Sequence, residues 1–228
     1  MKASKIKAFP KCRFLFDFEC YITYNINTLW NIYKQHEKEY FMNTVYPIKD
    51  QKQLDLMKMY LRNKNKRDYL MFMVGISSAL RISDILKLKV QDVWTGKKPQ
   101  ERIVLNEKKT GKSKIFPMTL NLQKAIKEYI NKYDPEPGDY LFVSRKGNKP
   151  ISRQHANRIL STAADYIGII EPTGTHSMRK TWGYWAYKSG VGLAYIMEVL
   201  NHSSVSHTMR YLGITQEELD KIYINLNL

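Results

Sequence analysis

The spacing of apolar and polar positions predicts a succession of helices from residue 45 onward. Asp50 precedes a helical pattern that runs through Leu61, and a second pattern leads up to Arg81. The basic, polar run 62–67 between them is expected to be a connection. Further helices are predicted near 120–132, 153–167, 176–189, 193–200, 205–211 and 216–224.

Capping residues punctuate these patterns. Thr119 and Ser152 precede two of the predicted helices and are suitable N-caps, while Gly168 and Gly190 follow helices where a left-handed C-terminal residue belongs. Ser83 is a candidate N-cap for a short helix with apolar positions at 85, 86 and 88. The caps therefore agree with the periodicity.

One stretch departs from the helical period. Residues 102–105 and 114–117 are strand-like and flank the turn Lys109-Thr110-Gly111-Lys112, which predicts a β-hairpin. The expected fold class is mainly α (α+β), with one small antiparallel sheet.

Residues 1–44 stand apart from the rest of the chain. They are rich in aromatic side chains and show no clean helical period, so no fold is predicted for them. We expect a short N-terminal segment, 1–44, that is a reduced remnant or an upstream extension, and one domain, 45–228. Met42 lies just before that domain, and a chain beginning there would be the domain alone.

The charge of the chain narrows the choice of partner. Lys and Arg number 37 against 21 Asp and Glu, giving a formal net charge of +16, well above the magnitude of about 8 that suffices for solubility. A polyanionic partner is indicated. Nucleic acid is favoured, and an anionic membrane surface is the alternative.

Other classes find little support in the sequence. No apolar run approaches a membrane span, and the N-terminus alternates apolar and charged residues, unlike a secretory signal, so a cytoplasmic protein is expected. Cys12 and Cys20 are the only cysteines, and no Cys/His cluster accompanies them. Neither a disulfide framework nor a zinc site is expected.

Several fragments in a fixed order carry the candidate chemistry: Ala79-Leu80-Arg81-Ile82-Ser83-Asp84-Ile85-Leu86, Lys109-Thr110-Gly111, His176-Ser177-Met178-Arg179, and Leu200-Asn201-His202 followed nine residues later by Tyr211. Together they resemble the phage-integrase family of tyrosine recombinases, and the resemblance runs from about Val45 to the C-terminus. It implies cleavage and rejoining of DNA through a 3′-phosphotyrosine, without ATP or another cofactor.

The two arginines suit that chemistry. Attack on a phosphodiester spreads negative charge over the non-bridging oxygens, and a guanidinium offers a fork of donors matched to them. The resemblance implies that Arg81 and Arg179 grip the scissile phosphate in place of a metal. It also implies that Asp84 orients Arg81.

The remaining site residues come from the same resemblance. His176, one helical turn before Arg179, would assist proton transfer, and His202 would donate a hydrogen bond to a phosphate oxygen. Tyr211 would be the nucleophile. Tyr223 is its nearest rival, but it lies beside a predicted apolar stripe and is better explained by packing.

The general acid is the least defined assignment. Lys109 matches the hairpin lysine of the family, which protonates the departing 5′ oxygen, and Lys112 and Lys114 remain alternatives. Asn201 stands where the family usually has glycine. The exchange is expected to be tolerated, because Asn suits a left-handed or capping position.

Site-specific recombination for integration, excision or resolution of mobile DNA is the expected function. The alternatives are DNA relaxation of the type IB topoisomerase kind and a non-catalytic DNA-binding regulator, with a helix-turn-helix repressor less favoured still. Recombination implies double-stranded DNA as partner and a homotetramer on paired sites. A final helix from Thr215, with apolar Leu219, Ile222 and Leu226, is expected to dock either on its own domain or on a neighbour.

Overall fold

A computed structural model describes residues 45–106, 113–218, 220 and 224 of the chain. The elements in order are α2 (Gln51–Lys64), α3 (Lys66–Ser78), α4 (Ile82–Ile85), α5 (Val90–Val93), β1 (Arg102–Asn106), β2 (Ser113–Pro117), α6 (Leu120–Tyr133), α7 (Arg153–Tyr166), α8 (Thr175–Lys188), α9 (Leu193–Leu200) and α10 (Val205–Leu212). The predicted mainly helical fold with a small antiparallel sheet is confirmed.

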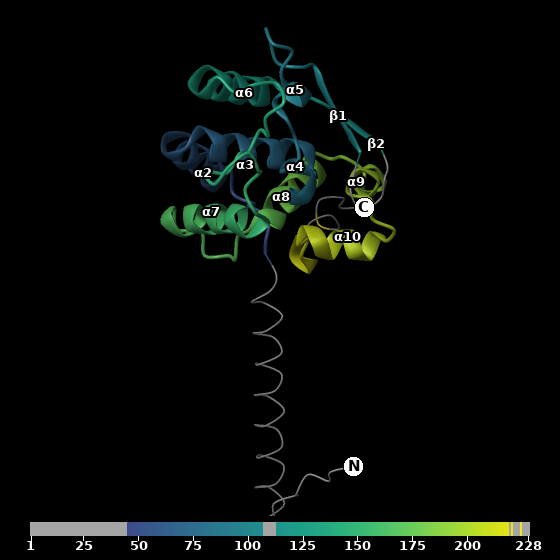
Figure 1. The fold of residues 1–228 in the computed structure, drawn as a ribbon. Coiled ribbons are helices and arrows are strands. Elements are labelled where there is room, and N and C mark those ends of the chain that lie inside the picture. Colours follow the sequence, from purple (N-terminus) through teal and green to yellow (C-terminus); the bar gives the residue numbers. More distant parts are fainter. Residues whose placement is uncertain (1–44, 107–112, 219, 221–223, 225–228) are drawn as a thin grey trace, which may run out of the picture. The chain divides into compact units, whose positions relative to one another are not determined.

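Helix α3 forms the centre of the main core. Its residues 69–75 are all buried, as expected for a helix that is apolar around nearly its whole circumference. Figure 1 shows α2 and α3 between α6 on one side and α7 on the other, with the β1–β2 hairpin beside α9. A side chain at Gly75 would collide with Met178, so the absence of a Cβ there lets α3 and α8 pack closely.

A smaller core joins α8, α9 and α10. It is built on Ala79, Ile196, Leu200 and Leu212, against which Tyr211 packs. Gly183 in the middle of α8 leaves the space that Leu212 fills, because a Cβ at 183 would overlap the Leu212 side chain. The three helices that carry the later sequence motifs therefore share one apolar cluster.

Most of the predicted caps are confirmed. Asp50, Thr119 and Ser152 accept hydrogen bonds from backbone N–H groups in the first turns of α2, α6 and α7. Gly168 and Gly190 follow α7 and α8 with φ angles of 79° and 84°. These conformations favour glycine, which has no Cβ to clash.

Two predictions about connections are wrong. The run 62–67 is not a linker, because α2 continues to Lys64 and α3 begins at Lys66. Asn65 alone separates them, since its side chain accepts from the N–H groups of Arg67 and Asp68 and so starts the new helix at once. Ser83 is not a cap either, because α4 begins one residue earlier and Arg81 is its N-cap residue.

The hairpin is confirmed as an antiparallel pair. β1 and β2 are in register from Arg102 opposite Pro117 to Asn106 opposite Ser113. The predicted turn, with Lys109 and Lys112, lies outside the described residues. Within the described ranges, no helix is long and apolar enough to cross a bilayer. Residues 1–44 and most of the predicted last helix, including Leu219, Ile222, Tyr223 and Leu226, also fall outside the description.

Candidate active site

Arg179 connects three of the motif segments. Its side chain is 3% exposed, although a helix arginine is usually on the surface. Nη1 donates to the carbonyl of Ala79 at 2.6 Å, and Nη2 donates to the carbonyl of Leu200 at 2.5 Å. The guanidinium is also hydrogen-bonded to Tyr211. One buried cation therefore links the turn before Arg81, the end of α9 and the candidate nucleophile.

Arg81 follows a left-handed turn. Ala79 ends α3 with φ 54° and is fully buried, and the chain then becomes extended at Arg81 before α4 begins. The positive charge of Arg81 lowers the pKa values of His176, His202 and Tyr211. Arg81 is therefore close enough to act electrostatically on three other candidate residues.

Asp84 lies in α4, three residues after Arg81. It is 3% exposed, and its backbone N–H donates to the Arg81 carbonyl at 2.9 Å. That the Asp84 carboxylate orients the Arg81 side chain stays a prediction.

His176 lies in the first turn of α8, which is anchored from both sides. The N–H of Gly174 donates to the Ser177 hydroxyl, and the N–H of Thr175 donates to the side chain of Asn157 in α7, both at 3.1 Å. Partial desolvation, followed by the charges of Arg179, Lys180 and Arg81, lowers the pKa of His176. Because its pKa lies below the usual value for histidine, the imidazole is neutral at physiological pH.

His202 begins the turn between α9 and α10. Asn201 before it adopts a left-handed conformation with φ 48°, as predicted for the position where the family has glycine. The ring contacts His207 and Tyr211 edge-on, with centroid distances of 4.6 Å and 4.8 Å. Desolvation, followed by the charges of His207, Arg179 and Arg81, lowers the pKa of His202 to about 4.

Tyr211 lies in the last turn of α10 and is partly buried among these groups. Burial raises the pKa of its hydroxyl, whereas the charge of Arg179, the hydrogen bond from Arg179 and the charge of Arg81 lower it. The net pKa is above that of an ordinary tyrosine. The phenol is therefore protonated before substrate arrives, and two cations already stand beside the oxygen that would become negative.

Lys180 is a site residue that sequence reasoning missed. Its ammonium lies 4.9 Å from the centroid of the Tyr211 ring, and desolvation lowers its pKa. The available signal was its position directly after Arg179 in α8. A cation over an aromatic face is attracted to the ring and restricts its orientation.

Lys114 makes a hydrogen bond that joins the hairpin to α9. Its Nζ donates to the carbonyl of Val199 at 2.7 Å, which ties strand β2 to the end of α9. Because Lys109 and Lys112 lie outside the described residues, the assignment of the general acid stays a prediction. The position of Lys114 favours an anchoring role for that lysine.

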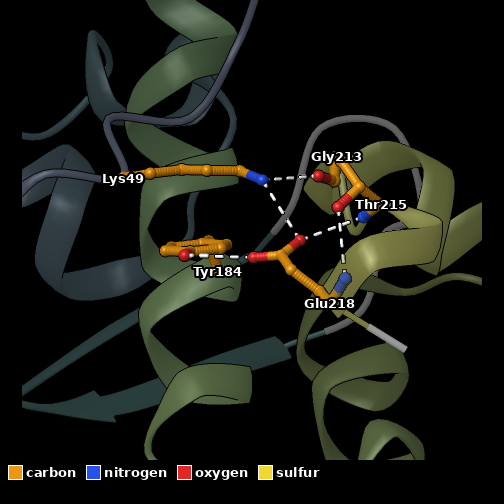
Figure 2. Close-up of polar contacts among 5 residues, drawn as sticks. All are labelled: Lys49, Tyr184, Gly213, Thr215 and Glu218. Carbon is orange, nitrogen blue, oxygen red and sulfur yellow. Dashed lines mark hydrogen bonds and ion pairs between the residues drawn. The ribbon is translucent and has the colours of Figure 1, made fainter. Parts of the chain in front are cut away.

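A polar cluster holds the chain that follows Tyr211. Figure 2 shows Lys49 reaching the carbonyl of Gly213 at 2.6 Å and the carboxylate of Glu218 at 3.3 Å. Glu218 also accepts from the Thr215 N–H at 3.0 Å and from the Tyr184 hydroxyl at 3.3 Å. Burial alone would raise the pKa of Glu218, but Thr215, Lys49 and Tyr184 together lower it.

This cluster fixes the end of α10 on its own domain. Gly213 is the C-cap of α10, two residues after Tyr211, and Lys49 belongs to the first described segment of the chain. No sequence pattern predicted the contact between Lys49 and Gly213, because neither residue belongs to a motif. Glu218 contacts Lys49 and Tyr184 of the same domain. The rest of the predicted last helix lies outside the described residues, so its docking in cis or in trans stays a prediction.

The site is cationic and contains no acidic cluster in its described part. Among the residues that the structure describes, no three His, Cys, Asp or Glu side chains lie close enough to hold a metal. The arrangement offers two guanidinium groups, two neutral imidazoles and one phenol, which suits an anionic substrate with a phosphorus centre. The structure thus brings together Arg81, His176, Arg179, His202 and Tyr211.

Comparison with known proteins identifies relatives of this arrangement. A model described as the phage integrase family matches residues 48–218. The chain is 43% identical over 182 residues to the probable integrase/recombinase YoeC of Bacillus subtilis (strain 168), covering 80% of this chain and 97% of YoeC.

Solved structures share the fold. The XerA recombinase superimposes with a TM-score of 0.66 at 21% identity, over 81% of this chain and 66% of XerA. The XerH site-specific recombinase, in a post-cleavage complex with its palindromic difH substrate, gives a TM-score of 0.62 at 17% identity, over 79% of this chain and 53% of XerH. The chain therefore spans nearly all of YoeC but about half to two thirds of these longer proteins.

Proposed function

Because the chain belongs to the phage integrase family and is a tyrosine-type site-specific DNA recombinase, we propose that Tyr211 is the nucleophile with which it cleaves DNA. The convergence of Arg81 and Arg179 on Tyr211 carries this proposal. The charges of both arginines lower the pKa of the Tyr211 hydroxyl, against the effect of its burial. The +16 net charge of the chain supports DNA as the substrate.

The reaction follows from the groups present. The Tyr211 oxygen attacks the scissile phosphorus, a P–O bond to tyrosine forms, and the P–O bond to the 5′ oxygen breaks. The proton leaves the phenol for a base, and the 5′ oxygen takes one from an acid. Charge that builds on the non-bridging oxygens is stabilised by Arg81 and Arg179. Reversal with another 5′ hydroxyl rejoins the strand without ATP.

The two imidazoles are suited to different steps. His176 is neutral and exposed, so it can accept a proton from the phenol as phosphate binds. His202 lies beside the Tyr211 ring and is assigned a hydrogen bond to a phosphate oxygen. Lys109 is proposed to protonate the leaving 5′ oxygen.

Assembly and domain organisation complete the proposal. We propose that residues 45–228 form the catalytic domain, which the family match over 48–218 supports. Recombination exchanges strands between two duplexes, so four protomers are proposed to assemble on paired sites.

A nicked duplex that carries the DNA junction beside the gene tests the nucleophile. Cleavage near the nick releases a short fragment and traps the covalent complex, which SDS gel electrophoresis resolves. Wild-type protein should form the adduct, whereas Tyr211→Phe should bind the duplex with unchanged affinity and form none, because only the hydroxyl is lost. Tyr187→Phe, in α8 outside the proposed chemistry, is the matched control and should form the adduct normally. Adduct formation by Tyr211→Phe would exclude this assignment.

A further inference from the structure

The hydroxyl of Thr208 connects α10 with the imidazole of His202. Thr208 is fully buried, and its Oγ1 donates to the Ser204 carbonyl at 2.8 Å. The same oxygen lies 3.1 Å from Nδ1 of His202. Threonine in a helix often returns its proton to the carbonyl one turn earlier, as here. Because a hydroxyl has one proton, Oγ1 is left to accept from Nδ1.

This hydrogen bond determines the state of the other ring nitrogen. A neutral imidazole carries one N–H, so a proton on Nδ1 leaves Nε2 with a lone pair. Nε2 makes no hydrogen bond to any residue in the part of the chain that the structure describes. Nε2 is therefore the nitrogen left for substrate.

The surroundings keep the ring neutral in the free protein. His207 and Tyr211 contact it from α10, Arg179 faces it from α8, and Arg81 acts on it from the start of α4. Desolvation is the main cause of the lowered pKa of the ring, and the charges of His207, Arg179 and Arg81 add to it. An anionic phosphate placed among these groups raises the pKa of His202, because a negative charge stabilises the protonated ring.

We propose that Thr208 is a positioning residue that fixes the tautomer of His202, so that Nε2 meets the scissile phosphate as a lone pair and donates only after it takes up a proton. The inference rests on the proposed function. The proton comes from solvent and ends on Nε2, no bond of the DNA changes in this step, and the imidazolium then donates to a phosphate oxygen. Substrate binding is thereby coupled to proton uptake.

Nitrogen NMR of the isolated protein with ¹⁵N-labelled histidine tests the tautomer without DNA. The His202 signals are assigned by their loss in His202→Gln. At neutral pH the wild-type ring should carry its proton on Nδ1, although histidine free in water prefers Nε2. Thr208→Val, which keeps the shape and removes the hydroxyl, should move the proton to Nε2, while Thr208→Ser should keep it on Nδ1. Circular dichroism confirms that each variant is folded.

A second readout uses the nicked duplex. Cleavage at subsaturating DNA should fall as pH rises in the wild type, because the required proton becomes scarce. Thr208→Val should lose this pH dependence, because Nε2–H can then donate to the phosphate without taking up a proton, and Thr208→Ser should restore it. A wild-type ring protonated on Nε2, or a Thr208→Val spectrum like the wild type, overturns the proposal. Failure of the protein to form any adduct would instead refute the proposed function and leave the NMR result standing.

Discussion

The ammonium of Lys49 and the carboxylate of Glu218 lie 3.3 Å apart, although 169 positions separate them in the chain. The same ammonium holds the Gly213 carbonyl at the end of α10. Lys49 thus joins the segment before α2 to the segment that follows α10. Because Tyr211 lies in the last turn of α10, we expect these contacts to help fix its position.

Removing the Lys49 ammonium should affect cleavage more than stability. An exposed or half-exposed ion pair contributes about 0–1 kcal/mol, so Lys49→Met should lower Tm by only a few degrees. The rate of covalent adduct formation should fall by roughly tenfold, because a small displacement of the nucleophile is costly. Lys49→Arg, which keeps a charged donor, should recover most of the rate. An unchanged rate in Lys49→Met would show that α10 is held without it.

Arg179→Lys should lower both stability and cleavage, although it keeps the positive charge. A lysine cannot satisfy the carbonyls of both Ala79 and Leu200 in the same planar geometry, and a buried carbonyl left unpaired costs about 1–3 kcal/mol. We expect a lower free energy of unfolding, measured by urea titration, and adduct formation reduced by at least about 100-fold. The exposed Arg153→Lys is the stability control and should unfold like the wild type.

The three hairpin lysines can be separated with sulfur chemistry. When sulfur replaces the bridging 5′ oxygen, the leaving thiolate needs no proton, because a thiol has a much lower pKa than an alcohol. Lys109→Ala should cleave normal DNA slowly and the sulfur-substituted strand at nearly the wild-type rate. Lys114→Ala should be slow on both, because Lys114 anchors the hairpin to the Val199 carbonyl.

The same experiment decides the assignment in every outcome. Rescue of Lys112→Ala or Lys114→Ala in place of Lys109→Ala would transfer the acid role to that residue. Arg81→Ala should stay slow on both strands, because it stabilises charge on the non-bridging oxygens. Rescue of no lysine variant would remove lysine from the role.

Stability should depend on the titration of His202. Its pKa is about 4 in the folded protein and near 6.5 when unfolded. Between these values the unfolded chain binds a proton that the native protein does not, so stability is complete above pH 6.5 and falls as the pH approaches 4. The contribution lost is about 2 kcal/mol after allowance for solvent screening.

Melting curves of the wild type and His202→Gln isolate this contribution. The difference in Tm between the two proteins should change by roughly 5 °C between pH 7 and pH 4.5, with the wild type losing more. Other groups titrate in the same range in both proteins and cancel in the difference. A pH-independent difference would mean that His202 titrates alike in the folded and unfolded chains.

The sequence predicted the helices well where local chemistry decides them. Asp50, Thr119 and Ser152 cap helices because their side chains reach N–H groups two or three residues away, and such contacts are visible in a linear pattern. The break at Asn65 was missed, because one residue ends one helix and begins the next, and a basic run conceals it.

The sequence predicted the candidate catalytic residues of the site but not the residues that contact and position them. Arg81, His176, Arg179, His202 and Tyr211 follow from ordered motifs, and their roles remain predictions. The contact of Lys180 with Tyr211 and that of Thr208 with His202 depend on how the elements around the site pack. The Lys49–Glu218 ion pair depends on how two distant segments of the chain meet. No local pattern encodes those relationships.

The absence of a side chain at Gly183 lets α10 pack closely against α8 at the active site. Helix α8 carries His176 and Arg179 in its first half, and Leu212, the neighbour of Tyr211, rests on Gly183 in its middle. A methyl group there overlaps the end of the Leu212 side chain, so that side chain or the end of α10 has to shift, while every reactive group stays chemically intact. In a genetic screen for lost recombination, a substitution at Gly183 therefore scores as a catalytic lesion, although the gene still encodes the full set of catalytic side chains.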